Sequence, residues 1–151
     1  MIDRRFPTAL QIMQTLVLLK RDSVPWVSSA AFAAFFRTNP TLMRRLLTTL
    51  VQHELLESQM GRNGGVRLGR SPDTITLKDI YQAAVPDKKL WNVRSDIPHR
   101  CTVSRNFEAY FEKLEVDADA ALMELLAGQT LEQSFAKLER LDKLHVPFGV
   151  M

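Results

Sequence analysis

Five polar side chains recur along one face of a predicted helix, and their chemical types suit contact with a polyanion. A helix turns by about 100° per residue, so positions at these spacings share the face opposite to the neighbouring leucines. Guanidinium forks, hydroxyls and a side-chain amide are groups that bind phosphates and base edges in the major groove of DNA. The helix 40–53 is therefore predicted to present a DNA-contacting face made of Thr41, Arg44, Arg45, Thr48 and Gln52.

The opposite face of the helix 40–53 is apolar and predicts contact with a hydrophobic core. Its members are Leu42, Met43, Leu46, Leu47 and Leu50. A solvated helix face is the alternative interpretation of the polar side, and two arginines by themselves do not exclude it. The basic, glycine-rich segment that follows favours the interpretation as a DNA contact.

A β-hairpin is predicted over 55–68, directly after this helix, with its turn at 61–65. Gly64 and Gly65 are expected to supply the positive φ angles that a tight hairpin turn needs. The glycine spacing does not match a nucleotide-binding loop, because it lacks the required motif and no helix follows it directly. The hairpin is therefore interpreted as a wing.

The wing, residues 57–68, carries three polar side chains that are predicted to contact DNA. Arg62 is expected at its tip, with Asn63 beside it and Arg67 on the returning strand. The minor groove is narrow and electronegative, and it attracts arginine. The alternative interpretation is that Arg62 only keeps a loop soluble.

Three shorter helices are predicted to frame the helix and hairpin, because apolar residues recur at helical spacing in each. They are expected over 7–21, 29–36 and 77–85. Side chains suited to N-terminal capping precede several helices, namely Ser28 or Ser29, Thr38 or Asn39, and Thr76 with Asp79. The pattern predicts a mainly α fold with a small β-hairpin: a winged helix-turn-helix domain over 1–72, then a linker helix and sensor-region loop over 73–104.

A long helix that begins near Arg105 has a different apolar pattern. Apolar residues are spaced alternately by four and three positions, which is the seam of a coiled coil. The seam consists of Phe107, Phe111, Leu114, Ala118, Ala121 and Leu125. It predicts self-association through this helix, and the alternative is a core helix that packs on its own domain. The region 105–151 is thus interpreted as dimerisation helices.

Other apolar positions in the region 105–151 are predicted to face the same chain. On the long helix, which Gly128 is expected to end, they are Tyr110, Leu122 and Leu126. A last helix is expected after Thr130, with four inward side chains, Leu131, Phe135, Leu138 and Leu141. The tail 146–151 is expected to be frayed.

Charge is distributed unevenly along the 151 residues. Residues 1–70 contain ten Lys/Arg and four Asp/Glu, which gives a net charge of +6. Residues 71–151 contain ten Lys/Arg and thirteen Asp/Glu, which gives a net charge of −3. The contents of 46% hydrophobic and 25% charged residues are those of an ordinary globular chain. A basic half joined to an acidic half predicts a polyanion-binding module attached to a second region that does not bind polyanions.

The sequence indicates a cytoplasmic protein without a membrane partner. Its longest apolar run, around 16–19, is far too short to cross a bilayer, and no signal peptide is apparent at the N-terminus. A single cysteine excludes a disulfide framework within one chain and fits a reducing compartment. The three histidines, His53, His99 and His145, lack the spacing of metal ligands, so no metal site is expected.

Cys101, the single cysteine, has two interpretations. His99 and Arg100 flank it and would favour the thiolate, so Cys101 is a candidate redox-reactive thiol. The alternative is a partly buried structural cysteine that packs below Trp91 or Phe107.

Three motifs resemble those of a known family, the small bacterial winged-helix regulators that include the iron–sulfur sensor IscR, the nitric-oxide sensor NsrR and the cysteine-metabolism repressor CymR. They are NP at 39–40 with RRLL at 44–47, GRNGGVRL at 61–68 and ITLKDIY at 75–81. The resemblance covers nearly the whole chain and implies a homodimeric, cytoplasmic transcription factor, usually a repressor. It also implies that Arg62 matches the wing residue that enters the minor groove and that the helix from Arg105 matches the dimerisation helix.

One feature departs from the iron–sulfur members of that family. Those members use three closely spaced cysteines in the segment that corresponds to 86–104, where this chain has only Cys101. One thiolate per chain falls short of a cluster ligand set. We therefore expect no iron–sulfur cluster and no other cofactor, as in the cluster-free branch of the family.

Together these features predict a dimeric, sequence-specific DNA-binding regulator whose partners are a double-stranded operator and a second copy of itself. The helix 40–53 would lie in the major groove and the wing 57–68 in the minor groove. The alternative is a winged-helix module that binds protein without reading DNA. An RNA-binding role would usually require exposed aromatic side chains, which neither element has. No enzyme constellation stands out, and no particular effector is indicated.

Overall fold

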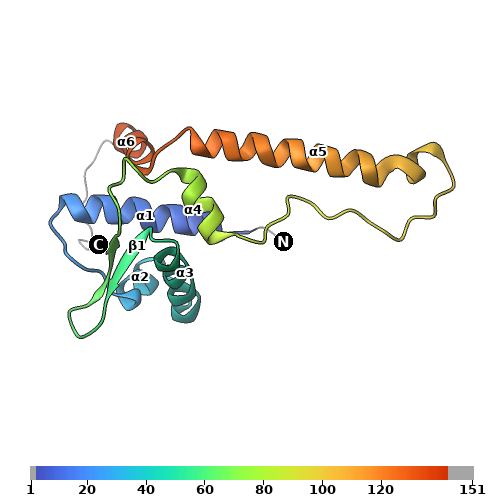
Figure 1. Ribbon diagram of the computed structural model, residues 1–151. Helices are drawn as coiled ribbons and strands as arrows, with labels where there is room; N and C mark the ends of the chain where they lie inside the picture. Colours follow the sequence, from blue (N-terminus) through green and yellow to red (C-terminus); the bar gives the residue numbers. More distant parts are fainter. Residues whose placement is uncertain (1–2, 143–151) are drawn as a thin grey trace.

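The computed structural model describes residues 3–142, and it confirms a mainly α-helical fold with one β-hairpin (Figure 1). The chain forms six helices and two strands within these residues. In order they are α1 (Arg5–Arg21), α2 (Ser29–Phe35), α3 (Pro40–Gln52), β1 (Leu56–Gln59), β2 (Gly65–Leu68), α4 (Leu77–Ala84), α5 (Thr102–Ala127) and α6 (Leu131–Leu141). The tail 146–151 and His145 lie outside the described residues.

Polar caps start the helices of the helix-turn-helix where the sequence predicts them. The hydroxyl of Ser28 accepts a hydrogen bond from the backbone N–H of Ala31 at the start of α2. The side chain of Asn39 accepts from the N–H groups of Thr41 and Leu42 at the start of α3. Such caps satisfy donors that the first helical turn leaves free. α1 begins at Arg5, two residues before its predicted start.

The core forms around α1, which lies in the middle of the domain against α3, α4, α6 and β2 (Figure 1). The largest fully buried side chains come from α1 to α4, β1, α6 and the residues just before β1 and α4. They are Ile12, Met13, Leu19, Phe32, Met43, Leu50, Leu55, Leu56, Ile75, Ile80 and Leu131. Each such side chain contributes about 1.5–3 kcal/mol through burial. Because α6 shares this core, it packs with the N-terminal elements although it follows the long helix in sequence.

The wing is anchored along β2 by a third backbone segment. β1 and β2 pair in antiparallel fashion from Leu56↔Leu68 to Gln59↔Gly65, and Val27 adds a bridge to Val66. A Cβ atom at Gly65 would lie 2.3 Å from the carbonyl oxygen of Val27, and the φ of Gly65 is +151°. Glycine is therefore required where the two backbones meet.

The turn of the wing differs from the expectation in one residue. Positive φ angles occur at Gly61 and Gly65, and the prediction of a positive φ at Gly64 is wrong. Gly64 is instead required by space, since a Cβ atom there would lie 2.1 Å from the carbonyl oxygen of Gln59. The hairpin thus uses its three glycines for two different reasons.

α4 begins with a capping box and is tied to the connection between α5 and α6. The Thr76 hydroxyl accepts from the N–H of Asp79, whose carboxylate accepts from the N–H of Thr76. Thr76 also forms a β-bridge with Thr130, and the N–H of Leu77 donates to the Gln129 carbonyl at 2.9 Å. The capping box is the predicted one, and it holds the junction of the two C-terminal helices against α4.

α5 is 26 residues long, and its N-terminal part runs away from the rest of the domain (Figure 1). It begins at Thr102, three residues before the predicted start. Leu126 is buried and Leu122 packs against the core, whereas Tyr110 is 64% exposed. The prediction that Tyr110 lies against its own chain is wrong, because only the last turns of α5 reach the core. No helix within residues 3–142 has the length and apolarity that a membrane span requires.

α6 is fixed to α1 by charge as well as by apolar contact. Arg21, at the end of α1, forms ion pairs of 2.6 Å with Glu132 and with Glu139, and its guanidinium lies 4.7 Å from the ring centroid of Phe135. Of the four α6 side chains predicted to face inward, Leu131 and Phe135 are buried.

The other two, Leu138 and Leu141, are 43% and 78% exposed, so their prediction is wrong. Exposure increases along α6 from its first turn to its last. The second half of α6 therefore extends beyond the core that buries its first half.

Candidate nucleic-acid interface

The outer face of α3 brings four of its five predicted contact residues together. Thr41, Arg44, Arg45 and Thr48 line one shallow surface hollow of about 320 Å³, and Gln52 is exposed at the end of the helix. Within residues 3–142, no hydrogen bond, ion pair or ring contact engages either guanidinium. Both arginines are therefore free to bind a ligand that approaches this face.

Thr49 also lines this hollow, and the sequence analysis did not include it. Its position four residues after Arg45 is the signal that could have identified it, since such positions are neighbours on a helix. The hydroxyl of Thr49 donates to the Arg45 carbonyl at 3.0 Å, and that of Thr48 donates to the Arg44 carbonyl at 2.8 Å. Each threonine can therefore offer a ligand its acceptor oxygen and its methyl group, but not its hydroxyl hydrogen.

Leu42 lies on the surface, although the apolar pattern predicts it in the core. It is 53% exposed, whereas its neighbour Met43 is 1% exposed. At 100° per residue, Leu42 lies at the edge between the polar and the apolar side of α3. Because Met43 of the same turn is buried, it is this angular position that exposes Leu42 and places it beside the face that carries the arginines.

The tip of the wing presents a second free guanidinium group. Arg62 and Asn63 are both exposed in the turn between β1 and β2. Among the described residues Arg62 has no hydrogen-bond, ion-pair or ring partner. The wing therefore extends an unpaired cation away from the body of the domain.

Arg67, the third predicted contact of the wing, already has partners within the chain. Its Nε donates to Glu57 Oε1 at 2.5 Å, and its guanidinium lies 4.3 Å from the ring centroid of Trp26. Glu57 and Arg67 are direct cross-strand neighbours in the observed register. Arg67 thus stabilises the base of the wing in this structure, an arrangement that sequence reasoning missed because it depends on the register.

The predicted seam of α5 is accessible in the single chain along most of its length. Phe107, Leu114 and Leu125 are 42%, 41% and 73% exposed. Ala121 is also exposed, and Ala118 is half-buried. Large apolar side chains exposed in a row on one helix commonly mark an interaction surface.

Phe111, the remaining seam residue, is half-buried within an aromatic group. Its ring lies 5.5 Å from Trp91, edge to face, and 5.5 Å from Phe107, stacked. The backbone N–H of Trp91 is 3.4 Å from Glu115 Oε1, which fastens the loop before α5 onto this helix. The aromatic group covers part of the seam with the chain's own loop.

The sequence of this chain matches one family along almost its whole length. Residues 2–137 match Rrf2, which is described as an iron-dependent transcriptional regulator. The chain belongs to the Rrf2 family. As a member of that family it is related to transcriptional regulators that bind DNA.

Relatives of this Rrf2 protein extend over most of its length. YwnA of Bacillus subtilis (strain 168), assigned to the HTH-type transcriptional regulators, is 24% identical over 132 residues, or 87% of this chain and 95% of YwnA. The structure of CymR, the global cysteine regulator of B. subtilis, is 23% identical with a TM-score of 0.62 and covers 91% of this chain and 97% of its own. The structure of T. potens IscR is 18% identical with a TM-score of 0.65, and the match covers 97% of this chain and 93% of the IscR chain. The two solved structures support the shared fold.

Among residues 3–142 of this Rrf2 protein, the donor atoms do not form a ligand set for an iron–sulfur cluster. The sequence has one cysteine, and residues 3–142 contain no group of three or more His, Cys, Asp or Glu side chains that could hold a metal ion. Clusters in proteins are held by four ligands, mostly thiolates. The description of the family as iron-dependent therefore has no matching ligand set within these residues.

Cys101 of this Rrf2 protein is exposed, so its interpretation as a partly buried packing residue is wrong. It is the N-cap of α5. Its Sγ lies 3.5 Å from both the backbone N and the Oγ of Ser104, and its own N–H donates to that Oγ at 3.0 Å. These hydrogen bonds from Ser104, and then the N–H of Val103, hold the pKa of the Cys101 thiol below its usual value. A redox role for Cys101 stays a prediction.

Replacement of Ser104 by alanine is expected to raise the pKa of Cys101, because it removes the hydroxyl that stabilises the thiolate. A smaller fraction of the thiol will then be ionised near neutral pH, and alkylation by iodoacetamide will be slower. The measurement is the alkylation rate against pH, with Ser58→Ala as a control on the remote strand β1. Identical pH profiles for Ser104→Ala and the unchanged protein would show that the Ser104 hydroxyl does not lower the pKa of Cys101.

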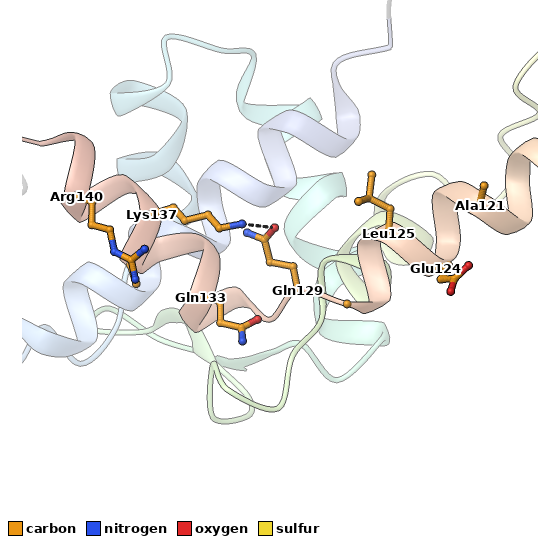
Figure 2. A pocket seen from close by; sticks show the side chains of 9 residues that line it. Ala121, Glu124, Leu125, Gln129, Gln133, Lys137 and Arg140 are labelled. Carbon is orange, nitrogen blue, oxygen red and sulfur yellow. Dashed lines mark hydrogen bonds between the residues drawn. The ribbon is translucent and has the colours of Figure 1, made fainter.

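A larger hollow of about 740 Å³ lies between the end of α5 and α6 (Figure 2). Two seam residues, Ala121 and Leu125, form one side of it, and Lys137 and Arg140 of α6 lie on the other. Lys137 Nζ donates to the side chain of Gln129 at 3.0 Å. The exposed seam of this Rrf2 protein thus continues into a concave surface with two cations.

Proposed function

We propose that this Rrf2 protein is a dimeric, sequence-specific DNA-binding regulator that acts as a repressor in the cytoplasm. α3 lies in the major groove and the wing in the minor groove. The observation that carries the proposal is the set of free guanidinium groups on two elements that project from one domain, Arg44 and Arg45 on α3 and Arg62 on the wing. This arrangement fits a duplex, whose two grooves are read by different elements.

The proposed DNA contacts fall into two groups. Residues of α3 bind base edges and flanking phosphates, and residues of the wing bind the minor groove. The contacts are Thr41, Arg44, Arg45, Thr48 and Gln52 on α3, and Arg62, Asn63 and Arg67 on the wing. For Arg67 to contribute, it has to exchange its contacts with Glu57 and Trp26 for a phosphate.

The proposed dimer forms through the seam of α5. Phe107, Leu114 and Leu125 remain exposed in the single chain and would be covered by the same row of a second copy. One recognition helix spans only a few base pairs, so two joined copies read half-sites that are a helical turn or more apart. Repression follows when such a dimer occupies DNA that the polymerase needs.

Selection of bound genomic DNA fragments tests this function. The purified protein is expected to enrich an inverted repeat, and Arg62→Ala is expected to lower affinity for that repeat by about 5- to 150-fold, the range for loss of one good base contact. Arg94→Ala is the matched control, because Arg94 pairs with Asp96 in the loop before α5. A folded protein that enriches no sequence at moderate salt would contradict DNA readout and favour the protein-binding alternative.

A further inference from the structure

We propose that Leu42 is a specificity-determining residue that contacts the 5-methyl group of a thymine in the major groove, beside a guanine bound by Arg45. This inference rests on the proposed function of α3 as the recognition helix. It assigns a base preference to a residue whose sequence pattern alone places it in the core.

The position of Leu42 is what separates it from an ordinary exposed leucine. Single leucines on a surface are common and need no explanation. Leu42, however, is the third residue of α3 and is 53% exposed. The N-terminal residues of a recognition helix are the ones that contact base edges. An apolar side chain at that point meets the floor of the major groove when α3 enters it.

The surroundings of Leu42 suit DNA better than a protein partner. On α3 its exposed neighbours Thr41, Arg44 and Arg45 are polar, so Leu42 belongs to no extended apolar patch on this helix. Protein interfaces usually need a larger contiguous apolar area. In the major groove, by contrast, the thymine methyl is the single apolar group that a base pair presents, and one aliphatic side chain covers it.

Leu42, Arg45 and Thr49 lie along one stripe of the helix, at positions i, i+3 and i+7. The guanidinium of Arg45 is free, and the Thr49 hydroxyl hydrogen is bound to the Arg45 carbonyl at 3.0 Å. The stripe therefore presents an aliphatic group, a guanidinium and a threonine methyl in turn. Guanidinium pairs with guanine O6 and N7, and methyl groups pair with the thymine methyl.

The spacing along the stripe limits which base pairs are involved. Three residues of helix rise by about 4.5 Å, and successive base pairs rise by about 3.4 Å. The thymine in contact with Leu42 is therefore one or two base pairs from the guanine in contact with Arg45. The proposal thus predicts a short guanine-and-thymine element within each half-site.

The test replaces thymine by deoxyuridine, which differs only by the 5-methyl group. Random-sequence duplex libraries made with thymidine or with deoxyuridine are selected on the unchanged protein and on Leu42→Ala. Single duplexes with one substituted position are then titrated. Removal of one buried methyl is expected to weaken binding about fourfold for the unchanged protein and by a smaller factor for Leu42→Ala, whose single methyl group reaches less far. Alanine is a strong helix former and the site is exposed, so the variant is expected to fold.

The controls separate this contact from a general loss of binding. Arg62→Ala should keep the full sensitivity to deoxyuridine within the α3 half-site, since Arg62 lies on the wing. Equal sensitivity of the unchanged protein and Leu42→Ala at every thymine would overturn the role of Leu42 while leaving DNA binding intact. Failure of the unchanged protein to enrich either library would overturn the proposed function itself, and the inference with it.

Discussion

Replacement of both Arg44 and Arg45 by alanine will lower the affinity of the protein for its DNA site by at least about 30-fold and leave the fold intact. Each good arginine contact to a base is worth about 1–3 kcal/mol, so two lost contacts account for that reduction. Both side chains are exposed and have no partner within residues 3–142, so their removal breaks no contact of the folded chain. The measurement is a titration of the selected operator at fixed salt.

The control for this variant removes two positive charges elsewhere. Lys137→Ala with Arg140→Ala changes the net charge by the same amount on α6, beside the hollow shown in Figure 2. This control is expected to change operator affinity by less than about threefold at moderate salt, because screening weakens distant charges. Equal losses in the two double variants would mean that total charge, rather than the face of α3, drives binding.

Replacement of Phe107 and Leu114 by aspartate is expected to convert the proposed dimer to a monomer and to lower operator affinity by about 10²- to 10⁴-fold. Both side chains are about 40% exposed in the single chain, so the substitutions leave the buried core unchanged. In the proposed dimer they would bring like charges into the seam and remove its apolar contact. The affinity loss follows because joining two binding modules raises their effective concentration by that factor.

Sedimentation or light scattering reports the oligomeric state, and the operator titration is repeated on the same sample. Val116→Asp is the matched control, since Val116 is 63% exposed and lies on the side of α5 opposite to the seam. That control should remain a dimer with unchanged affinity. Dissociation by Val116→Asp, or a persistent dimer after both seam substitutions, would contradict the proposed interface.

The helices and the wing were predictable because local chemistry determines where they begin. Asn39 ahead of Pro40 provides a cap and a preset first turn, and Thr76 with Asp79 forms the expected capping box. Closely spaced glycines fitted only a tight hairpin. Each of these signals acts within a few residues, so no knowledge of tertiary contacts was needed.

Features that depend on distant packing were not predictable from periodicity. Leu42 and Leu138 repeat at the spacing of core residues, yet both are exposed. Leu42 lies at the edge of the apolar side of α3, and the last turns of α6 extend past the core. The contact of Arg67 with Trp26 needs the hairpin register as well as the bridge from Val27 to Val66. The spacing of apolar residues indicates which side of a helix faces the core, but it does not indicate where along the helix the contact with the core ends.

Only the last turns of α5 reach the core, so the helix can act as a lever. Its 26 residues span about 39 Å, so a tilt of about 10° where it meets α4 and α6 would displace its far end by about 7 Å, the rise of two base pairs. Two backbone hydrogen bonds stabilise the junction of α4, α5 and α6. The N–H of Leu77 donates to the Gln129 carbonyl at 2.9 Å, and the N–H of Leu131 donates to the Ile75 carbonyl at 2.7 Å. In the proposed dimer, the stiffness of this small joint would set the range of angles between the two DNA-contacting domains.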